Sequence, residues 1–191
     1  MHSDISLFLK AIKFSAEKHR RQRRKDQQAS PYINHPIEVA DILWTIGNVN
    51  DVIVIVAALL HDTIEDTDAT PDELRIHFGE DVLALVLEVS DDKNLPKPER
   101  KRRQIEKAPF LSSRARLLKL ADKICNIRDI TYFPPQNWSW QRKFEYLEWA
   151  ASVIAGLRGV NRELEIHFDE IMAAAQKKLA REKDSAGHGH R

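Results

Sequence analysis

The sequence is poor in cysteine, in long apolar runs and in net charge. Its 191 residues include one cysteine, Cys125, which excludes a disulfide within the chain and favours a reducing compartment. No apolar run approaches the roughly 20 residues that cross a bilayer, so we expect no membrane partner. A formal net charge of +1 argues against nucleic acid as a partner. Because the N-terminus also lacks the basic-then-apolar layout of a signal peptide, we expect a cytoplasmic protein.

Length and composition indicate one globular domain. A chain of this size buries about two-thirds of the surface that its unfolded form exposes. The hydrophobic content of 42% and the charged content of 31% are ordinary for such a domain. We assign residues 1–183 to the domain and expect residues 184–191 (DSAGHGHR) to be a disordered tail.

Apolar residues recur at helical spacing along most of the chain. Thr70 and Glu73 form a capping-box pattern around Pro71 and predict a short helix that ends near Gly79. Pro36 favours a helix start beside His35. The remaining helices are expected at residues 4–21, 82–89, 113–130, 139–156 and 161–181. The pattern predicts an all-α fold.

Residues 52–66 read VIVIVAALLHDTIED and form the most apolar stretch of the chain. Periodicity alone does not decide its conformation, because residues 52–56 have strand propensity. The continuation through residues 57–60 favours a helix, and a lone strand would have no partner. We therefore predict one buried helix.

Four ionisable side chains close this apolar run: His61, Asp62, Glu65 and Asp66. At about 100° per residue they would share one side of a helix. Buried charges are costly unless they are paired, and a metal ion would pair them. The alternative is an exposed helix end followed by an acidic loop.

A stable metal site needs further ligands. His35 precedes Pro36 at a predicted helix start, and Asp122 interrupts the apolar sequence LLKLA. An aspartate in such a position is rarely buried without a partner. His35, His61, Asp62 and Asp122 would supply two imidazoles and two carboxylates, a set that suits Mn²⁺, Fe²⁺, Co²⁺ or Zn²⁺. A cation there would lower the pKa of a bound water and provide a nucleophile.

The motifs resemble the HD-domain metal phosphohydrolases. More narrowly, four segments are similar to the hydrolase domain of the RelA/SpoT homologues: RRKD, PYINHP, ALLHDTIEDT and LKLADKICNIRDI. The size of the chain and its segment DDKNLPKPERKR are similar to the small alarmone hydrolases of the metazoan type. The resemblance spans about residues 5–180.

The resemblance implies an all-α, single-domain HD helical bundle. It also implies a Mn²⁺-dependent hydrolase that removes the 3′-pyrophosphate of (p)ppGpp and gives GDP or GTP. His35, His61, Asp62 and Asp122 match the metal ligands, with one Mn²⁺ expected and Zn²⁺ or Fe²⁺ as alternatives. The catalytic pair corresponds to Glu65 and Asp66, whose separate roles stay open. The residues that match nucleotide-facing positions are Arg24, Lys25 and Asn126.

Two basic blocks in a near-neutral chain supply partners for an anionic substrate, at residues 20–25 and 100–103. Each could equally be a solvated helix face. Lys97, Lys101 and Arg142 are candidates for phosphate contacts, with solvated surface charge as the alternative.

Tyr146 is expected either to line the nucleotide pocket or to pack in the core. Trp138, Trp140 and Trp149 are expected in the core or at an interface, and Cys125 is expected to be a small buried apolar group.

Three functions stay open on these residues. The first is the alarmone hydrolase. The second keeps the metal site and changes the substrate, for instance to NADPH as a 2′-phosphatase. The third is a non-catalytic nucleotide-binding HD module, against which the pair Glu65–Asp66 argues. All three take a small-molecule nucleotide, and a homodimer stays an option for the oligomeric state.

Overall fold

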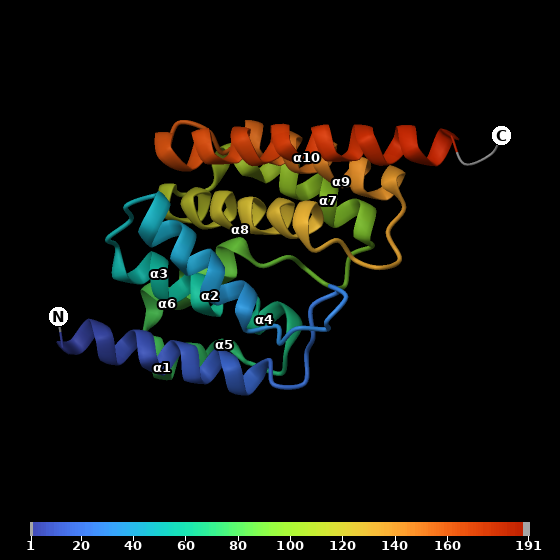
Figure 1. Ribbon diagram of the computed structural model, residues 1–191. Helices are drawn as coiled ribbons and strands as arrows, with labels where there is room; N and C mark the ends of the chain where they lie inside the picture. Colours follow the sequence, from blue (N-terminus) through green and yellow to red (C-terminus); the bar gives the residue numbers. More distant parts are fainter. Residues whose placement is uncertain (1, 189–191) are drawn as a thin grey trace.

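A computed structural model describes residues 2–188 as helices joined by loops (Figure 1). An isolated β-bridge joins Arg23 to Pro31 in the loop after the first helix. The helices are α1 (His2–Lys18), α2 (Asn34–Asp41), the π-helix η1 (Ile42–Ile46), α3 (Val52–Leu60), α4 (Thr63–Asp66), α5 (Pro71–Phe78), α6 (Glu80–Val89), α7 (Lys97–Lys107), the 3-10 helix η2 (Ala108–Phe110), α8 (Ser113–Tyr132), α9 (Trp140–Ala155) and α10 (Arg162–His188). The prediction of an all-α fold is confirmed.

The capping signals read from the sequence are present. The Thr70 hydroxyl accepts a hydrogen bond from the Glu73 backbone N–H, and the Glu73 carboxylate accepts one from the Thr70 N–H. This capping box begins α5, which ends at Phe78 and is followed by Gly79 with a φ of 85°. The hydroxyls of Ser112 and Ser139 cap α8 and α9 by accepting from the backbone N–H of Ala115 and Arg142, without the reciprocal bond of a capping box.

The apolar run at residues 52–60 is helical. A helix satisfies its own backbone hydrogen bonds, so it can be buried without a partner strand. Each residue from Val54 to Leu60 is buried in α3. The helix ends at Leu60, however, and a turn at His61 and Asp62 separates it from the short helix α4. The expectation of one continuous helix over residues 52–66 is therefore wrong at the two residues that carry the chemistry.

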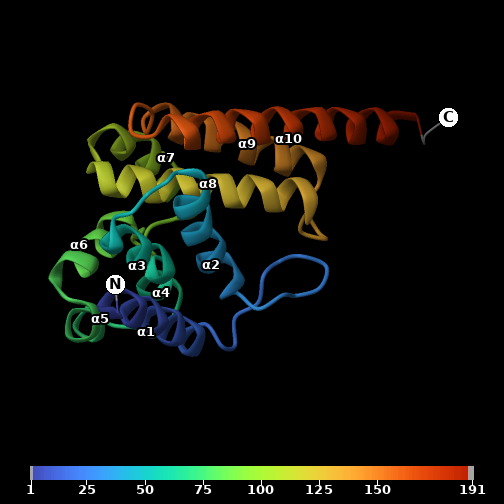
Figure 2. The ribbon, with the colours of Figure 1, turned by 60° about the vertical axis from the view of Figure 1, so that its left-hand side comes forward.

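The long helix α8 lies across the middle of the molecule (Figures 1 and 2). It packs against α9 and α10 on one side and against α2, α3 and α6 on the other. Its inner positions, including Leu118, Leu120, Ile124 and Ile127, are fully buried. Because α2, α3 and α8 pack against one another, polar side chains from all three can meet inside the bundle.

Two features differ from the sequence expectations. Residues Ile42–Ile46 are a π-helix, in which the Gly47 N–H donates to the Ile42 carbonyl five residues back. At the other end of the chain, α10 stays helical through His188. A helix therefore covers the first part of the segment expected to be a disordered tail, and residues 189–191 lie outside the described residues. Among the described helices, none is both long and apolar enough to cross a membrane.

Candidate active site

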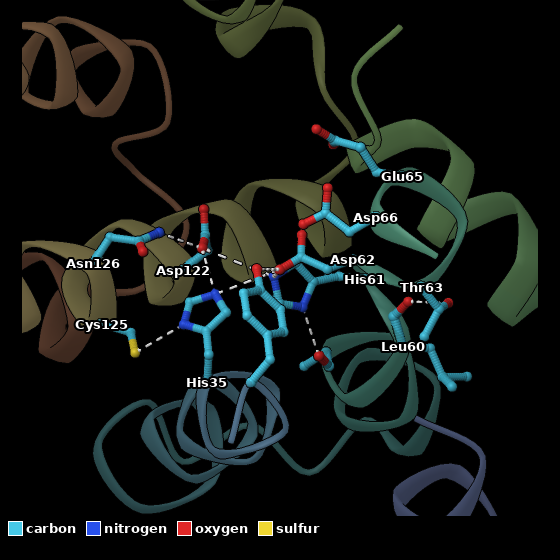
Figure 3. A network of polar contacts seen from close by, with 12 residues as sticks. His35, Leu60, His61, Asp62, Thr63, Glu65, Asp66, Asp122, Cys125 and Asn126 are labelled. Atoms are coloured by element: carbon cyan, nitrogen blue, oxygen red, sulfur yellow. Dashed lines mark hydrogen bonds and ion pairs between the residues drawn. The ribbon is translucent and has the colours of Figure 1, made fainter. Parts of the chain in front are cut away.

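Four predicted ligands meet where α2, α3 and α8 come together (Figure 3). We call these four residues, His35, His61, Asp62 and Asp122, the ligand cluster. The Nε2 atom of His35 lies 3.2 Å from Asp122 Oδ1, and Nε2 of His61 lies 3.2 Å from Asp62 Oδ2. The two crossed distances, His35 Nε2 to Asp62 Oδ2 and His61 Nε2 to Asp122 Oδ1, are 3.7 and 3.8 Å. Two nitrogens and two oxygens therefore converge on one small volume.

The ligand cluster is shielded from solvent. Its side chains are between 2% and 18% exposed. Burial disfavours the charged forms of Asp62 and Asp122, but the neighbouring histidines, and Lys123 beside Asp122, hold the pKa of both carboxyls below the usual range. Burial also opposes a charge on His61, yet Asp62 and Asp122 outweigh it and raise its pKa to about 9. The two carboxylates of the ligand cluster are thus ionised and attract positive charge.

The donor set fits a divalent cation. Nδ1 of His61 lies 2.7 Å from the Ala58 carbonyl oxygen, which can only accept, so Nδ1 carries a proton. In the neutral ring the lone pair then sits on Nε2, a buried atom with no hydrogen-bond partner in the described structure. Nitrogen and oxygen donors from His35, His61 and Asp62 lie within 4.8 Å of one another. A divalent metal ion would use the orphaned nitrogen and neutralise the carboxylates.

A second layer of contacts orients the ligands. Asp122 Oδ2 accepts from the Lys123 ammonium at 2.7 Å, and Oδ1 accepts from the Asn126 amide at 2.6 Å. Nδ1 of His35 lies 3.2 Å from Cys125 Sγ. The thiol is fully buried, and burial raises the pKa of Cys125 to about 12. Cys125 is therefore buried, as expected, and its sulfur also contacts His35 of the ligand cluster.

The two members of the predicted catalytic pair point to different neighbours. Glu65 Oε2 accepts from the Asp91 N–H at 3.0 Å, and Oε1 lies 3.5 Å from Nη1 of Arg100. Burial, followed by nearby carboxylates, raises the pKa of Glu65. Asp66 forms an ion pair with Lys93. The segment between α6 and α7 thus reaches both carboxylates.

A cavity of about 550 Å³ opens beside the ligand cluster. Its wall includes His35 and Asp66 together with four of the residues predicted to face a nucleotide, Arg24, Lys25, Asn126 and Tyr146. The volume is in the range of pockets for small molecules. Tyr146 lines this cavity and also packs edge-on against Trp149, with the ring centres 5.2 Å apart.

Arg24 is held in place at the cavity wall. It forms an ion pair with Asp129, and its guanidinium lies 5.9 Å from the centre of the Tyr32 ring. Asn126, one turn before Asp129 on α8, links the same wall to the ligand Asp122. Polar residues along α8, from Asp122 through Asn126 to Asp129, therefore connect the ligand cluster to the cavity wall.

The three predicted phosphate contacts, Lys97, Lys101 and Arg142, are absent from the wall of this cavity. They gather instead with Lys25 and Arg100, and we call this set the basic face. Burial, then Arg142, Lys25 and Arg100, lowers the pKa of Lys97. Burial and neighbouring cations do the same for Lys101, whose ammonium lies 4.7 Å from the Trp149 ring. The cations that lower the pKa of Lys97 and Lys101 therefore lie near these two lysines.

Several site residues were not identified from the sequence. Tyr32 donates a hydrogen bond to Asp62 at 2.5 Å, and Gln22 donates one to Asp66 at 3.3 Å. Trp138 was expected in the core or at an interface, but it lines the cavity with the Arg142 guanidinium 4.5 Å from its ring. The position of Tyr32 within PYINHP was the available signal, because it lies three residues before a predicted ligand. For Gln22 and Trp138 the sequence carries no comparable signal.

Comparison with known proteins agrees with this geometry. The model of the HD-domain family matches residues 11–146. The guanosine-3′,5′-bis(diphosphate) 3′-pyrophosphohydrolase MESH1 of Xenopus tropicalis is 54% identical over 90% of this chain and 96% of its own length. The human protein of the same name is 56% identical over 86% of this chain and 92% of its own.

A solved structure is similar throughout. The structure described as a metazoan ortholog of SpoT that hydrolyzes ppGpp aligns with a TM-score of 0.86 and 48% identity. The alignment covers 91% of this chain and 96% of that one. The chain therefore belongs to the HD-domain family and, within it, to the guanosine-3′,5′-bis(diphosphate) 3′-pyrophosphohydrolases.

Proposed function

We propose that this protein hydrolyses the 3′-pyrophosphate of guanosine 3′,5′-bis(diphosphate), giving GDP and pyrophosphate, and that the pentaphosphate gives GTP. One observation carries the proposal: His35 of the ligand cluster and Asp66 border the same cavity as Arg24, Lys25 and Asn126. A nucleotide in this cavity would contact Arg24, Lys25 and Asn126 while its phosphate group lies near His35 and Asp66. The names of the relatives support the same substrate.

The residues that would hold the divalent ion are His35, His61, Asp62 and Asp122. We propose Mn²⁺, because imidazole and carboxylate donors in a mixed set accept it and no thiolate faces the cluster. When bound, the ion supplies Lewis-acid polarisation of phosphorus–oxygen bonds and makes an attacking water more acidic. The chain itself fixes three of the four donors, His35, His61 and Asp122, through the contacts of Cys125, the Ala58 carbonyl, Lys123 and Asn126.

Glu65 and Asp66 divide the proton transfers. The raised pKa of Glu65 lets this carboxyl keep a proton nearer to neutral pH, which suits donation to the leaving 3′-oxygen. Asp66 faces the cavity with Lys93 and Gln22 as partners. Its carboxylate can orient the attacking water and accept its proton. The two environments thus favour opposite tasks for neighbouring carboxyls.

Arg24 and Asn126 would contact the guanine nucleoside, and Tyr146 would form part of the same wall. The basic face, with Lys97, Lys101 and Arg142, would bind the phosphates. Arginine suits bidentate phosphate binding, and lysine provides a point charge. We propose that this reaction takes place in the cytoplasm on a free nucleotide.

The test is a substrate panel resolved by product. Purified protein with Mn²⁺ is given the tetraphosphate nucleotide or NADPH, and phosphorus NMR identifies the products. We expect pyrophosphate and GDP from the first substrate, and no turnover after a chelator is added. Intact tetraphosphate with loaded protein would contradict the proposal. Orthophosphate from NADPH alone would indicate a 2′-phosphatase, and tight binding without any product would indicate a binding module.

A further inference from the structure

Tyr32 contacts a metal ligand without being one. Its hydroxyl donates a hydrogen bond to Oδ2 of Asp62 across 2.5 Å. The same Oδ2 atom lies 3.2 Å from Nε2 of His61 and 3.7 Å from Nε2 of His35. Tyr32 therefore bonds the carboxylate oxygen that faces both imidazoles. Hydrogen bonds from a hydroxyl to a carboxylate are short and strong at such distances.

The ring of Tyr32 is fixed on several sides. The ring of His19 lies 4.8 Å away at a shallow angle of 32°, and the ring of His35 lies 5.8 Å away, nearly edge-on. The backbone of Tyr32 donates to the Gln22 carbonyl at 3.2 Å and accepts from the His35 N–H at 2.9 Å. The position of the hydroxyl is thus set by both backbone and ring contacts.

Asp62 has little else to hold its side chain. It occupies the N-cap position of α4 but makes no side-chain capping hydrogen bond there. The other carboxylate of the cluster, Asp122, has Lys123 and Asn126 as donors in addition to the histidines. For Asp62, the Tyr32 hydroxyl supplies the corresponding restraint. Loss of that hydroxyl would leave the carboxylate free to turn away from the imidazoles.

We propose that Tyr32 is a positioning residue that orients Asp62 and thereby raises the affinity of the ligand cluster for its divalent cation. Partners that bond a ligand in this way typically contribute about 10- to 100-fold to metal affinity or activity. The inference rests on the metal-binding role given to the cluster under the proposed function. It does not depend on which nucleotide is hydrolysed.

The test compares Tyr32→Phe with the unaltered protein by titrating metal-free protein with Mn²⁺ and no nucleotide. Phenylalanine keeps the ring and removes only the hydroxyl. We expect the dissociation constant for Mn²⁺ to rise about 10- to 100-fold. We also expect kcat to return most of the way to that of the unaltered protein when Mn²⁺ is raised to saturation. The matched control for metal binding is Tyr132→Phe, which removes an exposed tyrosine hydroxyl on the cavity wall and should leave Mn²⁺ affinity unchanged.

An unchanged Mn²⁺ affinity in Tyr32→Phe would overturn the proposal. Thermal melts provide the second measurement: the variant should melt like the unaltered protein without metal and gain less from added Mn²⁺. A variant that stays unfolded even at high Mn²⁺ would show a purely structural role and would also overturn it. Because the Mn²⁺ titration and the thermal melts contain no nucleotide, these two results stand whether or not the substrate assignment is correct.

Discussion

The ligand cluster and the basic face lie in one molecule but are built by different rules. The side chains of the cluster are at most 18% exposed, and each has a named partner within 3.8 Å. On the basic face, Lys25, Lys97 and Arg142 are exposed. Burial and the neighbouring cations lower the pKa of Lys97, and the Arg142 guanidinium lies over the Trp138 ring. The side chains of the ligand cluster are thus paired with one another, whereas the cations of the basic face are exposed and could bind an anion.

The difference follows from solvation. A buried charge costs several kcal/mol unless it is paired, so few arrangements of the cluster are compatible with a stable fold. An exposed lysine costs almost nothing in many rotamers, so its position is weakly determined. We therefore expect changes in the cluster to have large, all-or-none effects and changes in the basic face to have graded, salt-dependent effects.

Asp62→Ala should have the largest effect. It removes a donor from the cluster and leaves two imidazoles facing one carboxylate. We expect bound Mn²⁺ to be lost and turnover to fall by about 10⁴-fold or more. Metal analysis and a pyrophosphate assay measure the two together. Asp68→Ala, at an exposed aspartate nearby, is the control, and unchanged turnover in Asp62→Ala would rule out the metal mechanism.

Glu65→Gln should separate catalysis from metal binding. The change keeps the shape of the side chain and its bond from the Asp91 N–H but removes proton transfer. We expect kcat to fall about a hundredfold to a thousandfold while Mn²⁺ affinity stays within a few-fold. Glu163→Gln, on the exposed face of α10, serves as the control. If Glu65→Gln lost its metal instead, Glu65 would belong with the ligand cluster.

The pH dependence of metal binding should set the cluster apart from the basic face. The pKa of His61 is raised to about 9, so below that pH a cation must displace a proton from the ring. Asp62 and Asp122, whose pKa values are lowered, stay ionised over the same range. Mn²⁺ affinity should thus fall as pH falls from 9 to 6, by at most about tenfold per pH unit. Calorimetry in buffers of different ionisation enthalpy would detect the released proton, and a flat profile would refute this assignment.

Lys97→Ala should have the smallest effect and the clearest dependence on salt. It removes one exposed cation of the basic face, so we expect KM for the tetraphosphate nucleotide to rise about tenfold with kcat nearly unchanged. Raising ionic strength should shrink the difference, because exposed charges are screened. Lys13→Ala on the exposed face of α1 should leave KM unchanged. A loss of kcat that persists in high salt would mean that Lys97 acts on the reacting atoms.

The contrast also explains what the sequence could predict. Asp122 was expected beside His61 and Asp62 because it interrupts an apolar segment, where an unpaired charge is too costly. His35 was expected there because it precedes Pro36 at a predicted helix start. The structure brings all four together. The helical conformation of α3 followed from the absence of a partner strand. Burial and the need to satisfy hydrogen bonds restrict the residue type at each position, so both can be predicted from the sequence.

Other features depend on relations that sequence does not record. Apolar spacing does not distinguish a π-helix from an α-helix over one turn, so η1 was not expected. The turn at His61 and Asp62 interrupts a run whose apolar residues and spacing are compatible with one continuous helix. Trp138 reaches the cavity through the fold of the loop before α9, and no periodicity encodes that path. The divergence of Glu65 and Asp66 depends on residues far away in the chain, namely Asp91 and Lys93.

The two histidines of the cluster differ in whether a substitution at a neighbouring position can change their orientation. The orientation of His61 is fixed by the main-chain carbonyl of Ala58, which every amino acid at that position retains. The orientation of His35 is fixed by the side chain of Cys125, which a single codon change removes. Substitution at position 125 can therefore change the orientation of His35, whereas no substitution at position 58 removes the carbonyl that orients His61. A laboratory selection for altered metal preference should accumulate its substitutions around His35.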